Sequence, residues 1–223
     1  MEIKAAIFDM DGTLIDSLFL WGVLWKKFGE KYLGDQSFMP SAEDDKKVRT
    51  QTLRDAMHLI HQNYGIGESG DALLEEANRL MREFYSSDVK MKPGALEFLQ
   101  YLKEKGVKTC IASATAPDLV ALAVEHLGLA PYFSAFFSCG AIGKGKDEPD
   151  VFLAAAEYLG EDICDTWVFE DSLVALETAV RIGMKTVGIY DPNNFGQETI
   201  KRITNVYVAE GETLMKVAVE NKR

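Results

Sequence analysis

Two aspartates, one residue apart at the end of an apolar run, give the first chemical signal in this chain. Residues 6–14 read AIFDMDGTL. Side chains alternate along a strand, so Asp9 and Asp11 can reach the same side where the strand ends. Gly12 permits a sharp exit from the sheet. Burying two carboxylates at the end of a strand costs more free energy than a purely structural role would justify. Open α/β sheets bind their ligands at such strand ends.

A capped turn and a calcium loop are the alternative interpretations of this string. A calcium loop that began at Asp9 would need a third acid, a glycine at its sixth position and a glutamate at its twelfth. The third acid and that glycine are missing, and Leu20 stands at the twelfth position. The spacing therefore argues against a calcium loop. The other segments of the chain must decide whether the two aspartates form a capped turn or a ligand site.

A second apolar run ends in a hydroxyl side chain. Residues 108–113, KTCIAS, end at Ser113, and Ala114 leads into a helical pattern from Pro117. A serine beside backbone N–H groups at a helix start suits a phosphate oxygen. A serine at a strand end is also a common capping residue, so this segment alone does not decide its role.

A lysine-containing loop and an acidic strand end follow. Residues 143–150 read GKGKDEPD, and residues 167–172 read WVFEDS. A lysine in the glycine-rich loop could neutralise a phosphoryl group, although lysines in such loops are usually solvated. The second segment ends in Glu170 and Asp171, again after an apolar run. The chain thus contains four segments whose polar side chains could bind a ligand or catalyse a reaction, and most of them follow a predicted strand.

In order and spacing, the four segments resemble the motifs of the haloacid dehalogenase superfamily. The first resembles the Asp-x-Asp-Gly-Thr motif of its phosphotransferase branch. The resemblance implies that Asp9 is a nucleophile that becomes an aspartyl phosphate and that Asp11 is a general acid/base. Dehalogenase members lack the second aspartate, and phosphonate-cleaving members carry a small residue there. Asp11 therefore points to phosphoryl transfer.

The resemblance also implies roles for the later segments. Ser113 and Ala114 would bind phosphate, and Lys146 would too, because Lys146 and not Lys144 has the family's spacing to the Pro-Asp pair at 149–150. Asp147 stands where the family usually has proline, which predicts a less rigid loop. The fourth segment has the Glu-Asp-Ser form that is common close to β-phosphoglucomutase, with alanine replacing a familiar glycine at position 175.

The acids of the first and fourth segments predict a magnesium site. Asp9, Asp171 and Glu170 would repel one another and be driven towards protonation without a cation. Hard oxygen ligands without histidine or cysteine favour Mg²⁺ over zinc. By the resemblance, Asp11 adds its backbone carbonyl to this ion.

The composition of the chain argues against some classes of binding partner and indicates its compartment. The 223 residues carry a net charge of −11, which argues against nucleic acid and against an anionic membrane. Three cysteines without paired spacing indicate reduced thiols, and with no signal segment or transmembrane run we expect a cytoplasmic protein. We expect a small phosphorylated metabolite as the partner, and the oligomeric state cannot be read from the sequence.

The order of the elements predicts two domains. Alternating strands and helices at 1–15 and 90–223 predict an α/β fold, a doubly wound, mostly parallel Rossmann-like sheet. Residues 16–89 read as helical and resemble the family's small α-helical cap. Helices are expected at about 42–63 and 71–85, with tryptophans in the bundle core. His58 and His61 are expected to be solvated, because no further metal ligand accompanies them.

Three functions follow. The first is a Mg²⁺-dependent phosphatase that hydrolyses a small phosphorylated metabolite, such as a sugar phosphate. The second is a sugar phosphomutase like β-phosphoglucomutase, but the stretch from Leu33 to Asp55 shows no clear match to the arginine-containing cap signature of that relative. That stretch is instead acidic, with Glu43, Asp44 and Asp45. The third is a non-enzymatic sensor of the same fold, which the complete set of motif residues disfavours.

Overall fold

The computed structural model describes residues 2–49 and 51–220, and the chain divides into two compact units. Met1–Leu18 and Val89–Arg223 form an α/β unit, and Phe19–Asp88 form a helical unit between them in the sequence. Each unit is described by itself below.

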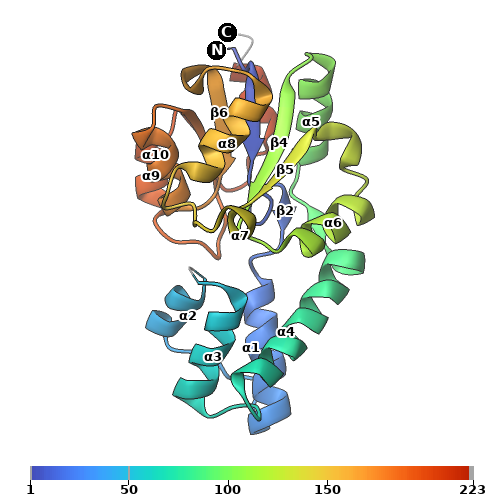
Figure 1. Ribbon diagram of the computed structural model, residues 1–223, viewed down its shortest axis with the longest axis vertical. Coiled ribbons are helices and arrows are strands. Elements are labelled where there is room, and N and C mark those ends of the chain that lie inside the picture. The colour runs from blue at the N-terminus through green and yellow to red at the C-terminus, as the bar shows by residue number, and fades with distance from the viewer. Residues whose placement is uncertain (1, 50, 221–223) are drawn as a thin grey trace. The chain divides into compact units, whose positions relative to one another are not determined.

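A six-stranded parallel sheet forms the centre of the α/β unit, in the order β5-β4-β1-β6-β7-β8 (Figure 1). From β1 the chain builds outward on one side through β4 and β5, then returns to build β6, β7 and β8 on the other side. The order of the strands thus reverses around β1, and such a point is where open α/β sheets bind ligands. The predicted doubly wound sheet is confirmed. The strands are β1 (Ala5–Phe8), β4 (Lys108–Ser113), β5 (Ala135–Ser138), β6 (Thr166–Glu170), β7 (Lys185–Ile189) and β8 (Val206–Val208).

The two faces of the sheet bury different side chains because residues alternate along β1. Ala5 and Ile7 join a core cluster with residues of α8 (Asp150–Leu159) and α9 (Leu173–Arg181). Phe8 faces the other way, where its ring stacks on Phe169 with centroids 4.3 Å apart. Phe98 of α5 (Ala95–Glu104) packs edge-on against Phe8 on that face. Helices on both faces therefore bury β1 completely.

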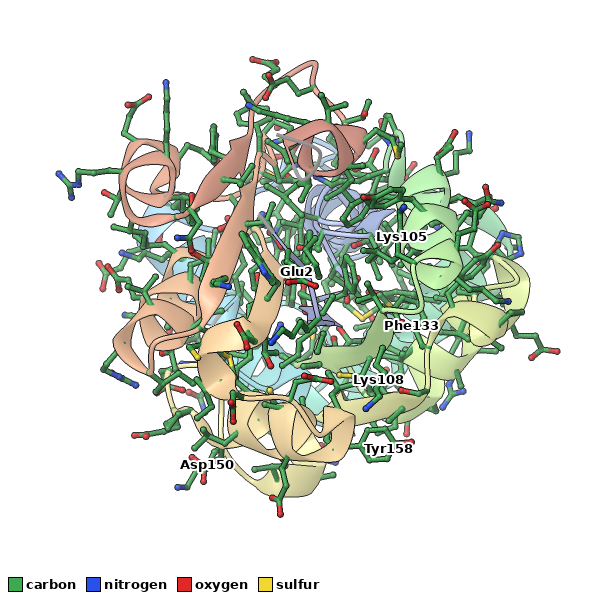
Figure 2. All side chains as sticks on the ribbon, turned by 90° about the horizontal axis from the view of Figure 1, so that it is seen from above. Glu2, Lys105, Lys108, Phe133, Asp150 and Tyr158 are labelled. Atoms are coloured by element: carbon green, nitrogen blue, oxygen red, sulfur yellow. The ribbon has the colours of Figure 1, made fainter. Side chains whose placement is uncertain are left out.

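Polar contacts tie α8 to the edge of the sheet. The Lys108 ammonium donates to the carbonyl of Leu159 at 2.8 Å, and the Tyr158 hydroxyl donates to the carbonyl of Ser134 at 2.9 Å. Figure 2 labels Lys108 and Tyr158 on this part of the molecule. These bonds hold the end of α8 against β4 and the segment that leads into β5.

A short antiparallel ribbon joins the two chain segments that lead to and from the helical unit. Its strands are β2 (Ile15–Asp16) and β3 (Lys90–Met91). Two residues per strand are too few for an alternating pattern, so the sequence did not predict it. The other helices of the α/β unit are α6 (Pro117–His126), α7 (Cys139–Ile142), α10 (Gln197–Ile203) and α11 (Met215–Glu220), with 3₁₀ turns at Ala130–Tyr132 and Ile163–Asp165.

The helical unit packs around a core that includes Trp25, Phe28 and Leu73. Trp25 is fully buried, as expected for a bundle core, and its indole N–H donates to Asp45 at 3.0 Å. The helices are α1 (Leu20–Phe28), α2 (Ala42–Val48), α3 (Leu53–Tyr64) and α4 (Gly70–Glu83), with single π-helical turns at Gly29–Leu33 and Phe84–Asp88.

The single helix expected at about 42–63 is wrong, because α2 and α3 are separate. Ser41 caps α2 by accepting from the N–H of Asp44. A second cap follows eleven residues later, where the Thr52 hydroxyl accepts from the N–H of Asp55 at 3.2 Å. A side chain that satisfies the free N–H groups of a helix start favours a new helix there. Because the apolar periodicity continues through the segment, the sequence pattern did not indicate this second helix start.

The two histidines of α3 lie against protein acceptors. His58 Nε2 lies 3.2 Å from Asp71 Oδ1, and His61 Nδ1 lies 2.9 Å from the carbonyl of Ile66. Within residues 2–49 and 51–220, no helix has both the length and the apolar character needed to cross a bilayer.

Candidate active site

Three neighbouring strands bring the motif residues to one edge of the sheet. Phe8 of β1 is in register with Ile111 of β4 and with Phe169 of β6. Asp9 follows directly, and its N–H donates to the carbonyl of Phe169 at 2.9 Å. Ser113 ends β4 and Glu170 ends β6. The carboxyl ends of parallel strands meet at the same edge, so segments more than 150 residues apart in sequence meet here.

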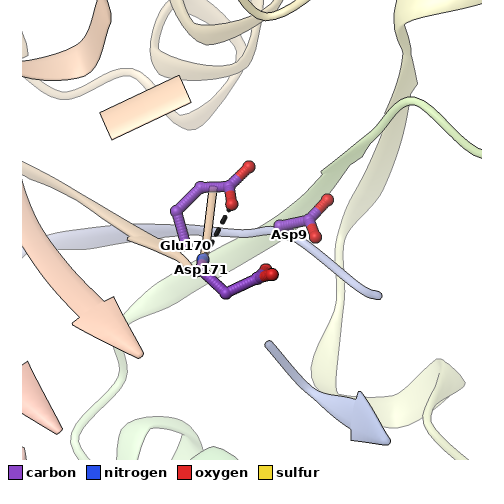
Figure 3. A group of neighbouring side chains, drawn as sticks. All are labelled: Asp9, Glu170 and Asp171. Atoms are coloured by element: carbon purple, nitrogen blue, oxygen red, sulfur yellow. Dashed lines mark hydrogen bonds between the residues drawn. The ribbon is translucent and has the colours of Figure 1, made fainter. Parts of the chain in front are cut away.

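Asp9, Glu170 and Asp171 form a buried acidic cluster, drawn in Figure 3. Their exposed fractions are 8%, 1% and 2%. Each offers one carboxylate oxygen, and these oxygens all lie within 4.8 Å of one another. Among the described residues, this is the one group of acids, histidines or cysteines with the spacing to hold a metal ion.

Lys146 is the lysine that reaches the acidic cluster. Its ammonium donates to Asp9 and, at 2.6 Å, to Glu170 Oε1. Lys144 instead pairs with Asp150 on the surface at 2.9 Å. The spacing to the Pro-Asp pair therefore selected the lysine that the structure places beside Asp9.

The loop that carries Lys146 is held without the proline of the family motif. The carbonyl of Asp147 accepts from the Thr178 hydroxyl at 3.0 Å and from the Arg181 guanidinium at 2.8 Å. Both donors belong to α9, which packs against β6. These two bonds anchor the Asp147 carbonyl next to Lys146, and the less rigid loop stays a prediction of the sequence.

Both oxygens of Glu170 have partners. Oε1 accepts from Lys146, and Oε2 accepts from the N–H groups of Asp171 and Ser172, each at 2.8 Å. The latter bond lies at the start of α9, where helix N–H groups are free and favour a carboxylate. Glu170 thus orients Lys146 as well as belonging to the acidic cluster.

Asp171 lies against the turn that follows β1. Its Oδ1 accepts from the Thr13 hydroxyl at 2.9 Å, and its Oδ2 accepts from the Asn194 amide at 2.7 Å. A Cβ atom on Gly12 would lie 2.4 Å from Oδ2, and Gly12 has a φ of +76°. Both the close approach and the left-handed conformation require glycine. Gly12 therefore allows the turn after β1, which carries Asp9 and Asp11, to pack against Asp171.

Asp11 is not one of the three clustered acids, and its carboxylate accepts from two hydroxyl groups. Its Oδ1 accepts from the Ser17 hydroxyl and its Oδ2 from the Thr115 hydroxyl, each at 2.7 Å. The N–H of Thr115 donates to the Ser113 hydroxyl at 3.0 Å, which leaves the Ser113 proton free to be donated to another group. Ala114, between them, is exposed. Sequence reasoning missed Ser17 and Thr115, although both are hydroxyl residues close to motif residues.

Burial and mutual repulsion set the protonation of the cluster. Burial, together with Glu170 and other nearby carboxylates, holds the pKa of Asp9 well above its usual range despite the attraction of Lys146. Burial and Glu170 raise the pKa of Asp171 to about 7. For Lys146, burial acts to lower the pKa, but Asp9 and Glu170 outweigh it and raise the pKa above its ordinary value. Three carboxylates lie close together and a single ammonium contacts two of them, so the donor set and its charge fit a divalent cation.

We expect the metal-free protein to lose stability as the pH rises from about 4 to about 7. The pKa values of Asp9 and Asp171 are raised in the folded state, so the folded protein binds more protons than the unfolded chain in this window. The unfolding temperature in EDTA should therefore fall by about 3 °C or more between pH 5 and pH 8.

Asp171→Asn is the control for this pH dependence, because it removes one titrating group. Its unfolding temperature should change less with pH than that of the wild type, and added Mg²⁺ should stabilise the wild type more at pH 8 than at pH 5. An equal pH dependence in the two proteins would contradict the assignment of this effect to Asp171.

Known proteins share both the sequence pattern and the fold. Residues 3–183 match the sequence profile of the haloacid dehalogenase-like hydrolase family. The chain is 25% identical over 201 residues to the phosphorylated carbohydrates phosphatase of Thermotoga maritima, covering 89% of this chain and 91% of that protein. It is 26% identical over 192 residues to the validoxylamine A 7′-phosphate phosphatase of Streptomyces hygroscopicus, covering 83% and 85%.

A solved structure shows the same fold. The β-phosphoglucomutase of Clostridium difficile superposes with a TM-score of 0.74 at 20% identity, covering 99% of this chain and 97% of that one. At this identity the likeness concerns the fold alone. The profile match spans well over half of the residues, and the chain belongs to the haloacid dehalogenase-like hydrolase family.

Proposed function

We propose that this protein is a Mg²⁺-dependent phosphatase that hydrolyses a small phosphorylated metabolite through an aspartyl phosphate on Asp9. The observation that carries the proposal is the setting of Asp9. Its carboxylate lies buried at the end of β1, in contact with Lys146 and beside the Asp171 and Glu170 carboxylates. Such a cationic and acidic arrangement suits in-line phosphoryl transfer, which depends on positioning and charge neutralisation.

In the first step, a carboxylate oxygen of Asp9 attacks the phosphorus of the substrate. The bond from phosphorus to the ester oxygen breaks, and Asp11 gives its proton to the departing alcohol. Lys146 and the Ser113 hydroxyl would neutralise and orient the phosphoryl oxygens. The contacts of Asp11 with Ser17 and Thr115 support this role, because they hold a carboxyl group that is not one of the three clustered acids.

In the second step, water attacks the phosphorus of the aspartyl phosphate. Asp11, now a carboxylate, takes a proton from that water, and inorganic phosphate leaves as the Asp9 carboxylate is restored. The same residue thus acts as an acid and then as a base. Each step balances its protons without another titrating group.

Asp9, Asp171 and Glu170 would hold Mg²⁺, with the backbone carbonyl of Asp11 as a further ligand. When bound, this cation would neutralise charge on the phosphoryl group and on the carboxylates around it. The excess of three carboxylates over one ammonium supports the assignment, and the all-oxygen donor set favours Mg²⁺ over softer metals.

We infer that the helical unit acts as the cap that reads the substrate. The boundaries expected for this domain are residues 16–89, and the compact helical unit spans Phe19–Asp88. Candidate side chains for recognition are Lys26, Lys47, Arg49 and Arg54, although charges on a helix usually form a solvated face. Three of them pair with carboxylates of the same unit, Lys47 with Glu43, Arg49 with Asp45 and Arg54 with Asp71. A cap that closes over a phosphoryl-transfer site would exclude bulk water during the first step.

A small metabolite in the cytoplasm fits the remaining features of the chain. The net charge of −11 disfavours nucleic acid as a partner, so positive charge must be placed locally at the site, as Lys146 provides. Cys110, Cys139 and Cys164 are free, which supports a reducing compartment.

A sugar phosphomutase is the second candidate function. The fold shared with a β-phosphoglucomutase favours neither function over the other, since the identity to that protein is only 20%. A mutase must hold a second phosphate, whereas the first turn of α2 is acidic, with Glu43, Asp44 and Asp45. The phosphatase names of the two curated relatives also favour hydrolysis.

One assay separates the candidates. The protein is incubated with β-glucose 1-phosphate, both with and without a trace of glucose 1,6-bisphosphate, and inorganic phosphate and glucose 6-phosphate are both measured. Release of inorganic phosphate, there or from another member of a panel of phosphorylated metabolites, supports the phosphatase. Formation of glucose 6-phosphate identifies a mutase, and the absence of both products across the panel contradicts the enzyme proposal.

We expect EDTA to abolish phosphatase activity and Mg²⁺ to restore it, because the acidic cluster needs a hard cation. Turnover should be measured after exhaustive chelation and again after titration with Mg²⁺ or Zn²⁺ alone. Activity that survives chelation, or that returns far better with zinc, would contradict the site as proposed.

A further inference from the structure

We propose that Asn194 is a positioning residue that aims the Asp171 carboxylate at the metal ion. The inference rests on the metal site of the proposed function and concerns a residue outside the four motifs. Asn194 lies after β7, in the segment between Ile189 and α10. Its side chain contacts Asp171 directly and contacts no other member of the acidic cluster in the hydrogen bonds of the described residues.

Asn194 contacts both the side chain and the backbone of Asp171. The Asn194 amide nitrogen donates to the Asp171 carboxylate at 2.7 Å and to the Asp171 backbone carbonyl at 3.1 Å. One amide group thereby links the side chain and the main chain of Asp171, which restricts the rotation of its carboxylate. The Thr13 hydroxyl holds the other carboxylate oxygen at 2.9 Å.

The orientation of the Asn194 amide is itself determined. Its carbonyl oxygen accepts from the N–H of Phe195 at 2.8 Å, so its NH₂ group must face Asp171. The two sides of the amide therefore meet an N–H donor on one side and oxygen acceptors on the other. A flipped amide would place oxygen against oxygen at Asp171 and nitrogen against the Phe195 N–H.

The segment that carries Asn194 is anchored by a buried ion pair. Asp191 is fully buried, and its carboxylate accepts from the Lys92 ammonium at 2.7 Å and from the N–H of Asn193 at 2.8 Å. The N–H of Asn194 donates to the carbonyl of Asp191 at 3.2 Å. Lys92 directly follows β3, so this anchor joins the returning linker strand to the Asn194 segment.

The need for such an anchor follows from charge. Asp171 lies within the acidic cluster, yet Lys146 contacts Asp9 and Glu170 and donates no hydrogen bond to Asp171. Repulsion from the other two carboxylates would turn the Asp171 carboxylate away if it were held only by its own torsions. Thr13 and Asn194 are neutral donors that hold it in place and leave lone pairs for a metal ion.

The test measures Mg²⁺ binding without substrate, by calorimetric titration of the EDTA-treated full chain. Asn194→Ala should raise the Mg²⁺ dissociation constant about tenfold or more, as loss of a residue that orients a metal ligand commonly does. Phe195→Ala is the matched control, because its exposed ring is removed while its N–H remains. The control should bind Mg²⁺ as the wild type does.

Asn194→Gln tests whether the amide itself matters. It keeps the donor on a longer stem, so it should recover part of the affinity lost in Asn194→Ala, which a purely structural role in the loop would not explain. If Asn194→Ala does not fold, the comparison of Asn194→Gln with Phe195→Ala still decides, since a weaker affinity is expected for the glutamine variant. Unfolding temperatures in EDTA report the folding of every variant.

Two outcomes overturn the inference in different ways. Equal Mg²⁺ affinity in the wild type, Phe195→Ala and every folded Asn194 variant would show that Asn194 does not act on the metal site, with the proposed function intact. Absence of Mg²⁺ binding by the wild type would instead remove the metal site of the proposed function.

Discussion

Asp9→Asn should reduce turnover by at least about 10⁴-fold and leave the protein folded, as loss of a covalent nucleophile does in other enzymes. An amide cannot form the aspartyl phosphate. The fold should persist because the substitution removes one negative charge from three crowded carboxylates, and Lys146 keeps its contact with Glu170. Turnover would be measured with the best substrate of the metabolite panel, and folding by circular dichroism and the unfolding temperature.

Asp165→Asn is a matched control for that substitution. Asp165 lies just before β6, at the amino end of the strand and so at the opposite edge from the site, where it pairs with Lys4 on the surface. It should keep wild-type turnover. A folded Asp9→Asn protein with near-normal activity would contradict the nucleophilic role.

Asp11→Asn should reduce turnover by about 10²–10⁴-fold for substrates with poor leaving groups, the usual contribution of general acid/base catalysis. A sugar alcohol needs a proton as it leaves. A phenolate departs without one, so an aryl phosphate should lose much less of its rate. Single-turnover formation of the phosphoenzyme, followed by rapid quench, isolates the first step from the later hydrolysis.

The contrast between the two substrates identifies the role of Asp11. Equal losses for the sugar phosphate and the aryl phosphate in single-turnover measurements would mean that Asp11 positions groups instead of donating a proton. Its contacts with Ser17 and Thr115 should persist in part in the asparagine variant through the amide oxygen, so a large structural change is not expected.

The sheet was predictable because its strands are apolar runs bounded by polar residues. The run that ends at Ser113 is predicted as 108–113 and forms β4 over the same residues. The run around Ile7 forms a strand that stops at Phe8, one residue before Asp9. Burial on both faces makes such strands continuous in hydrophobicity, which is why the sequence pattern finds them.

Local capping was harder to see than periodicity. Leu53, Met57 and Ile60 continue the apolar pattern of the preceding residues, and this continuity hid the new start at Thr52. The C-terminal helix begins at Met215 and does not extend back to Glu212. Glu212 instead accepts from the N–H of Ala209 at 2.8 Å, which closes a turn before the helix.

The acids and the lysine of the site could be named from motif spacing, but their supporting contacts could not. Thr115 and Asn194 each meet an aspartate more than 20 positions away in the sequence. Such contacts depend on which strands are neighbours and on the path of the loops between them. An asparagine in a loop has many ordinary uses, so its type alone gave no signal.

The most direct test of the proposed mechanism is to trap the phosphoenzyme. The protein is mixed with Mg²⁺ and the best panel substrate, quenched during turnover, reduced with borohydride, and mapped by peptide mass spectrometry. Because an acyl phosphate is reduced to an alcohol, we predict this change on the peptide that contains Asp9, and its absence in Asp9→Asn. An acid-stable phosphate on Ser113 or Thr115, or turnover with no modified peptide at any quench time, would contradict the account.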